Sequence, residues 1–261
     1  MIPDNTIPQN SIPQKKLDEF VTRINQEAGA NLQSVILFGS AVAGDFHPEF
    51  SNLNLFCVLR DTSFAALQAL APVARWWDGQ KQPPPLFMTS HELQRSNDVF
   101  TIELLDMQQH HKVLFGDDVL LELQIPMDLH RVQVEYELRE KLILLRQQML
   151  LSSGNTRRLW ELLVRSVSSF VTLFRHALIV LGHPAPVGKR ETVNTLAERL
   201  KFDASAILQI LDVREHRANP KTFDVNDLFS RYLAIAEQVT AAVDEAHEAH
   251  EALGTNTPSG S

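Results

Sequence analysis

The chain has 261 residues, of which 44% are hydrophobic and 21% are charged, a balance typical of a soluble globular protein with a sizeable core. Its net charge of −8 argues against broad, sequence-independent binding to nucleic acids, because the overall field repels polyanions. Cys57 is the only cysteine, so no disulfide can form within the chain.

The N-terminal segment, residues 1–13, predicts an extended arm. Pro3, Pro8 and Pro13 recur at even spacing and disfavour a helix, and such an arm could dock on a partner subunit in a homodimer. The segment lacks the basic start and apolar core of a signal peptide. No apolar run approaches the roughly 20 residues of a membrane span. We therefore expect a cytoplasmic protein with no membrane partner.

Residues 14–125 alternate between helical and strand-like patterns, which predicts an α/β or α+β domain. Apolar residues at helical spacing indicate a first helix that stops at Gly29. A second helix is expected within residues 64–77, bent or interrupted at Pro72. Short apolar runs predict strands at residues 34–38, 53–59, 86–90 and 112–118. Cys57 lies inside the second run, which predicts a buried thiol.

Residues 126–250 contain no convincing strand and predict an up-and-down helical bundle. The helical patterns cover residues 129–151, 156–181, 191–201, 203–217 and 224–245. Residues 251–261 have the composition of a linker, and we expect them to be disordered.

A Gly-Ser turn between the first two strands is the main candidate site. Gly39 permits a tight turn and a close approach of the backbone to a ligand, and Ser40 supplies a hydroxyl group. The turn is expected to lead into a helix whose N-terminal amides receive phosphate oxygens. Positions 52 and 54 share one face of the next strand, where acidic residues would hold divalent metals. Asn52 and Asn54 occupy them.

This order of features resembles the DNA polymerase beta-like nucleotidyltransferase superfamily, with its kanamycin nucleotidyltransferase-like and small bacterial members. The family signature of Gly-Ser, Gly-Asp and Ser-Asp-x-Asp corresponds here to Gly39-Ser40, Gly44-Asp45 and Ser51-Asn52-Leu53-Asn54. The resemblance implies an α+β fold: a mixed sheet with flanking helices over residues 14–125, followed by an all-α bundle over residues 126–250. It implies ligand-binding roles for the matching polar positions, which are Gly39, Ser40, Asp45, Ser51, Asn52 and Asn54.

The chain departs from the metal chemistry of that family. Members hold two Mg²⁺ ions with the Asp pair and usually with a third carboxylate on a later strand. Asn52 and Asn54 offer carbonyl oxygens but no charge, and the strand at residues 86–90 has no Asp or Glu. Ala43 stands where relatives often have a basic residue. A designed Asp-to-Asn exchange would explain the pair but not the acid-free strand. The resulting hypothesis is a degenerate protein that binds a nucleotide or another small anionic ligand without a metal.

Two alternatives remain open from the sequence. An active transferase would move a nucleotidyl group from a nucleoside triphosphate to a small molecule or a protein. It would need rearranged acids and Mg²⁺, with Asp45 and Glu49 as replacement ligands or Glu103 as a base. A non-catalytic scaffold or dimerisation module would use the N-terminal arm and the bundle. Otherwise these three acids are solvated loop or helix-edge residues.

Other polar and aromatic groups have ordinary structural interpretations beside functional ones. His110, His111, His247 and His250 are expected at surfaces, because no acid with a recognised metal spacing accompanies them. Trp76 and Trp77 are expected to pack in a core or interface, although a stacking platform for a base is the alternative. Six basic residues of the bundle could line a cleft as a basic wall. Alternatively, they are solvated or form ion pairs between helices. They are Arg175, His176, Arg214, His216, Arg217 and Lys221.

Overall fold

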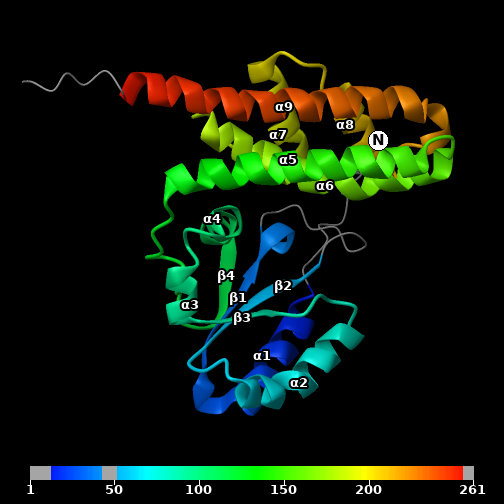
Figure 1. Cartoon of the computed structure of the whole chain (residues 1–261). Coiled ribbons are helices and arrows are strands. Elements are labelled where there is room, and N and C mark those ends of the chain that lie inside the picture. The colour runs from blue at the N-terminus through cyan, green and yellow to red at the C-terminus, as the bar shows by residue number, and fades with distance from the viewer. Residues whose placement is uncertain (1–12, 43–51, 255–261) are drawn as a thin grey trace, which may run out of the picture. The chain divides into compact units, whose positions relative to one another are not determined.

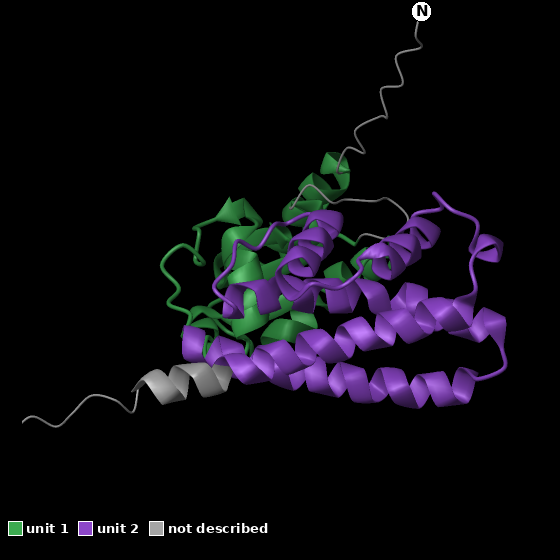
Figure 2. Cartoon of the chain, turned by 90° about the horizontal axis from the view of Figure 1, so that it is seen from above, with its two compact units in different colours: residues 1–126 green, residues 127–261 purple. Residues whose placement is uncertain are grey.

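The computed structural model describes residues 13–42 and 52–254, with side chains through residue 246 (Figure 1). The chain divides into two compact units, Met1–Pro126 and Met127–Ser261 (Figure 2). The division falls beside Pro126, where the sequence changes from alternating strand and helix patterns to helical patterns alone.

Unit 1 is built on a four-stranded mixed sheet with the order β3-β2-β1-β4. The strands are β1 (Leu32–Phe38), β2 (Asn54–Leu59), β3 (Leu86–Thr89) and β4 (His111–Gly116). Strand β1 pairs antiparallel with β2 and with β4, whereas β2 pairs parallel with β3. The four strands predicted from short apolar runs are thereby confirmed.

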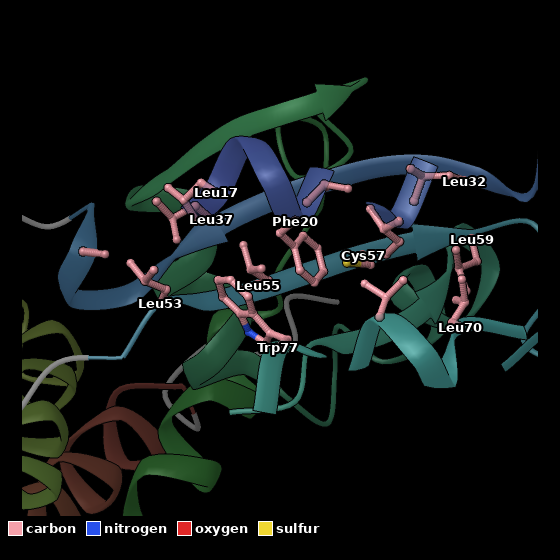
Figure 3. Close-up of a cluster of buried hydrophobic side chains, with 14 residues drawn as sticks. Leu17, Phe20, Leu32, Leu37, Leu53, Leu55, Cys57, Leu59, Leu70 and Trp77 are labelled. Atoms are coloured by element: carbon pink, nitrogen blue, oxygen red, sulfur yellow. The ribbon is translucent and has the colours of Figure 1, made fainter. Parts of the chain in front are cut away.

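Helices cover both faces of this sheet. On one face, α1 (Gln14–Ala28) and α2 (Phe64–Gly79) enclose a cluster that contains Phe20, Cys57 and Trp77 (Figure 3). On the other face, α3 (Ser90–Arg95) and α4 (Thr101–Gln109) contribute to a second cluster around Ile36 and Phe56. Successive strand residues point to opposite faces, so strands buried on both sides must be almost continuously apolar.

Helix α2 continues through Pro72 to Gly79, so the expected interruption at this proline is absent. Its start is capped by Ser63, whose hydroxyl accepts a hydrogen bond from the backbone N–H of Ala66 at 3.4 Å. Pro72 removes one backbone bond of the helix, but Val73 and Trp77 in the following turns are buried. Tertiary packing therefore holds together a helix that its local sequence weakens.

Unit 2 contains helices and no strand among its described residues. They are α5 (Met127–Ser152), α6 (Thr156–Val180), α7 (Lys189–Leu200), α8 (Ser205–Arg214) and α9 (Val225–Gly254). Helix α6 contacts each of the other four, while α5 and α9 run side by side (Figure 1). The five predicted helical segments are confirmed, although α9 extends beyond the expected end at residue 245.

Helix α6 is long and apolar enough, by length and composition, to cross a membrane. The sequence expectation concerned uninterrupted apolar runs, whereas α6 qualifies through the mean hydropathy of a window that also contains polar residues. More than half of the qualifying stretch is buried in the structure, and core residues such as Leu163, Val167 and Phe174 are fully covered. These features are those of the central helix of a bundle.

Polar groups connect the helices of unit 2. Arg190 on α7 donates hydrogen bonds to Asp212 on α8 at 2.8 Å and to Glu215, just beyond α8, at 2.7 Å. His130 on α5 and His176 on α6 are both fully buried, and Nε2 of His130 lies 2.8 Å from Nδ1 of His176. This histidine pair ties the two helices together inside the core.

Candidate functional site

The Gly39–Ser40 turn follows directly after β1. Gly39 has a φ of +79°, in the left-handed region that glycine tolerates best. Residues Gly39–Ala41 form a single 3-10 turn, closed by a hydrogen bond from the Val42 N–H to the Gly39 carbonyl at 2.9 Å. The described residues thus show one short turn where a longer helix was expected, and the chain beyond Val42 lies outside them.

The two asparagines approach this turn from the neighbouring strand. Asn54 is the first residue of β2 and is the register partner of Phe38, the last residue of β1. A Cβ atom on Gly39 would lie 2.9 Å from Nδ2 of Asn54, so the Asn54 side chain packs directly against the glycine. Asn52 is exposed, Leu53 is buried and Asn54 is partly buried. This alternation places both amides on the same side of the segment.

Gln82 is a supporting residue that the sequence did not reveal. Its side-chain oxygen accepts a hydrogen bond from the backbone N–H of Leu53 at 2.7 Å, between the two asparagines. This bond fixes the entry into β2 from a loop 29 positions further along the chain. The only local signal is a polar residue immediately before Pro83, Pro84 and Pro85, and that pattern does not point to a partner.

Among the described residues, the groups that positions 52 and 54 and strand β3 contribute at this end of the sheet are neutral. Asn52 and Asn54 supply amide groups, and β3 has no acidic residue. No three His, Cys, Asp or Glu residues gather closely enough to hold a metal within the described ranges 13–42 and 52–246. These residues do not fit a site for two Mg²⁺ ions, which is usually built on carboxylates. The candidates Asp45, Glu49 and Ser51, as well as Ala43 and Gly44, lie outside the described residues.

Comparison with solved structures finds a similar protein, the spectinomycin adenyltransferase AAD(9) from Enterococcus faecialis, solved with ATP and spectinomycin. The TM-score is 0.54 and the identity is 17%, over 86% of this chain and 98% of the other. The chain has a nucleotidyltransferase-like α+β fold. The sequence itself matches no protein-family model and no curated protein. At this identity the structural likeness shows the fold alone.

Within the nucleotidyltransferase-like fold, Glu103 lies in the first turn of α4 and is exposed. Helix α4 leads through His110 into β4, whose first residue, His111, is the register partner of Phe38. Nε2 of His111 lies 2.9 Å from a carboxylate oxygen of Asp118. The side chain of His111 is only 12% exposed, so this histidine is a paired group near the turn rather than a free surface group.

Two further candidates prove to be core residues of unit 1. Cys57 is fully buried, and its burial raises the pKa of the thiol far above the usual range, so the predicted inert role is confirmed. Trp77 is also fully buried and stacks at a tilt on Phe20. The guanidinium of Arg23 lies 4.5 Å from the ring centre of Trp76. The tryptophan pair therefore has the expected packing role.

The bundle residues named for a basic wall occupy different environments. His176 is fully buried and Arg175 is 7% exposed. Arg214 donates a hydrogen bond to the carbonyl of Val164 at 2.7 Å, and Arg217 pairs with Glu215 at 3.2 Å. Interhelical and local pairing therefore engages at least part of this group inside unit 2. His247 and His250 lie beyond the side chains that the structure describes.

Proposed function

We propose that the protein binds a nucleotide, or another phosphate-bearing ligand, at the Gly39–Ser40 turn without efficient metal-dependent transfer. The supporting observation is the turn itself: a left-handed glycine at the end of β1, followed by a serine and flanked by the amide of Asn54. Backbone N–H groups, a hydroxyl and amide N–H groups can all donate hydrogen bonds to phosphate oxygens. AAD(9), whose fold is similar, was solved with ATP.

Binding without efficient transfer follows from the neutral side chains of Asn52 and Asn54. Two carboxylates beside a triphosphate would repel it unless bound Mg²⁺ compensated their charge, whereas Asn52 and Asn54 impose no such repulsion. Ligand binding at this turn should therefore be largely independent of Mg²⁺.

Isothermal titration of the wild type with each of the four nucleoside triphosphates, with and without Mg²⁺, tests the proposal. We expect at least one to bind with similar affinity in both conditions, and Ser40→Ala to weaken that binding by about tenfold. Failure of every nucleotide to bind in either condition would refute nucleotide binding; inorganic pyrophosphate then tests the broader anionic ligand. Binding that appears only with Mg²⁺ would contradict metal-independent binding. Release of pyrophosphate from the nucleotide would contradict the absence of efficient transfer.

The double variant Asn52→Asp/Asn54→Asp tests whether positions 52 and 54 face the bound ligand. We expect it to bind nucleotide more weakly than the wild type without Mg²⁺ and to regain affinity when Mg²⁺ is added. The control Asn194→Asp/Asn226→Asp adds the same two charges at exposed positions on α7 and α9 and should behave as the wild type. An identical response of both double variants would show that positions 52 and 54 do not face the ligand.

A further inference from the structure

Helix α5 carries an apolar face that the core of unit 2 does not use. Its buried residues, which include Val134, Leu138 and Leu142, lie along one side. Of the eight large apolar residues of α5 that are 40–71% exposed, all but Met127 lie away from this buried side. These seven are Leu129, Val132, Tyr136, Ile143, Leu144, Leu150 and Leu151, and we call them the α5 stripe.

The spacing of the α5 stripe is regular. Leu129, Tyr136, Ile143 and Leu150 follow one another at intervals of seven residues, close to two full helical turns. They therefore form one line along the helix surface, and the remaining three members flank it. Scattered exposed apolar residues are normal on a protein surface, but a line of this length is typical of a helix that packs against another helix.

We propose that the α5 stripe is a dimer interface in which α5 of one protomer packs antiparallel against α5 of a second copy. In this arrangement Tyr136 of each copy faces Ile143 of the other, and Leu129 faces Leu150. The stripe is self-complementary about its midpoint, as a two-fold interface requires. This inference does not depend on the proposed ligand site.

The exposed area of the α5 stripe is large enough for an interface with a second copy. Seven large side chains with these exposed fractions leave on the order of 600 Å² on each protomer, so that pairing two copies removes about 1,200 Å² from water, near the lower limit for a stable interface. Shallow depressions flank α5 on both sides. Ile143 borders one of them with Thr240 of α9, and Leu144 borders the other with Phe170 of α6. These depressions can receive side chains from the second copy.

Sedimentation equilibrium of the full chain tests the interface. We expect the wild type to be a dimer at micromolar concentration, and the single variants Tyr136→Glu and Ile143→Lys to raise the dimer dissociation constant at least tenfold. An equimolar mixture of these two variants should recover the dimer, because the new carboxylate at position 136 then faces the new ammonium at position 143. A monomeric wild type, or a dimer that both substitutions leave intact, would overturn the proposal.

Two controls separate the interface from general effects. Phe64→Glu introduces the same kind of charge at an 81% exposed apolar residue on α2, and we expect it to leave the dimer intact. The double variant Tyr136→Cys/Ile143→Cys should form intermolecular disulfides under mild oxidation, whereas Ile143→Cys alone should not. Cys57 is buried and gives little background. Cross-linking by Ile143→Cys alone would instead indicate a parallel pair and contradict the proposed arrangement.

Discussion

Gly39 and Gly116 show how single residues shape the two ends of strand β1: Gly39 follows its last residue, whereas Gly116 is the register partner of Ser34 near its start. Both have a positive φ, +79° at Gly39 and +74° at Gly116. A methyl group on Gly39 would press on the Asn54 side chain, which can move, whereas one on Gly116 would meet the backbone of Gln33, which cannot move without disturbing β1. An added side chain should therefore lower the free energy of unfolding by different amounts at the two glycines.

We expect Gly39→Ala to lower the free energy of unfolding by about 1–2 kcal/mol, because an L-residue at this φ is strained. Gly116→Ala should cost more, since backbone atoms must shift. The matched control is Gly79→Ala at the end of α2, where nothing lies within 4 Å of the new methyl group. Urea denaturation of the three variants measures these differences. Equal losses for Gly39→Ala and Gly79→Ala would contradict the assigned conformation.

At the scale of elements, local patterns and tertiary packing do not always agree. The strands and most helix bounds follow from apolar periodicity and from stop signals such as Gly29 at the end of α1. Helix α2 differs, because a bend or an interruption is expected at Pro72 and the helix continues without interruption to Gly79. The buried side chains that follow the proline keep the helix continuous.

Replacing Pro72 should therefore stabilise the protein. Pro72 is exposed, so Pro72→Ala removes no core contact, and it restores the missing backbone hydrogen bond of α2. We expect a gain of about 1–3 kcal/mol in the free energy of unfolding, measured by urea denaturation. Pro220 provides the control, because it opens a 3-10 turn where proline is well suited. Pro220→Ala should be neutral or slightly destabilising, and a similar gain there would contradict the helix-specific explanation.

The histidine pair between α5 and α6 should make stability depend on pH. Burial, together with the neighbouring His176, lowers the pKa of His130 to about 4. The unfolded chain takes up this proton below a pKa of about 6.5, but the folded protein does not until about pH 4, so stability is complete above pH 6.5 and falls as the pH drops through this window. Between pH 7 and pH 5, the lowered pKa of His130 should therefore reduce the free energy of unfolding by about 2 kcal/mol.

Denaturation of the wild type and of His130→Leu/His176→Leu at pH 7 and pH 5 measures this effect. The double variant should lose less stability than the wild type as the pH falls. His91 is exposed, so His91→Gln should follow the wild type. An unchanged pH dependence in the double variant would show that the pair does not remain neutral in the fold.

At the scale of the whole molecule, the net charge of −8 limits which partners can bind without specific contacts. We expect no detectable shift of random-sequence duplex DNA or single-stranded RNA by micromolar protein at about 150 mM salt, since non-specific affinity should be weaker than about 10⁻⁴ M. A gel-shift assay with a basic protein as the positive control measures this. Micromolar binding that falls with added salt would indicate a basic surface that the net charge conceals.

Local sequence patterns specify most elements of both units and the place of the Gly39–Ser40 turn, because apolar periodicity, stop residues and glycine act over a few positions. The sequence also indicated the nucleotidyltransferase-like fold through the order of its motifs. Tertiary packing, in contrast, sets the sheet order, the hydrogen bond from the Leu53 N–H to Gln82, the contact of Asn54 with Gly39, the buried histidine pair and the exposed line on α5. The first four join residues far apart along the chain. The exposure of α5 depends on which face its neighbours cover, and no local pattern specifies either.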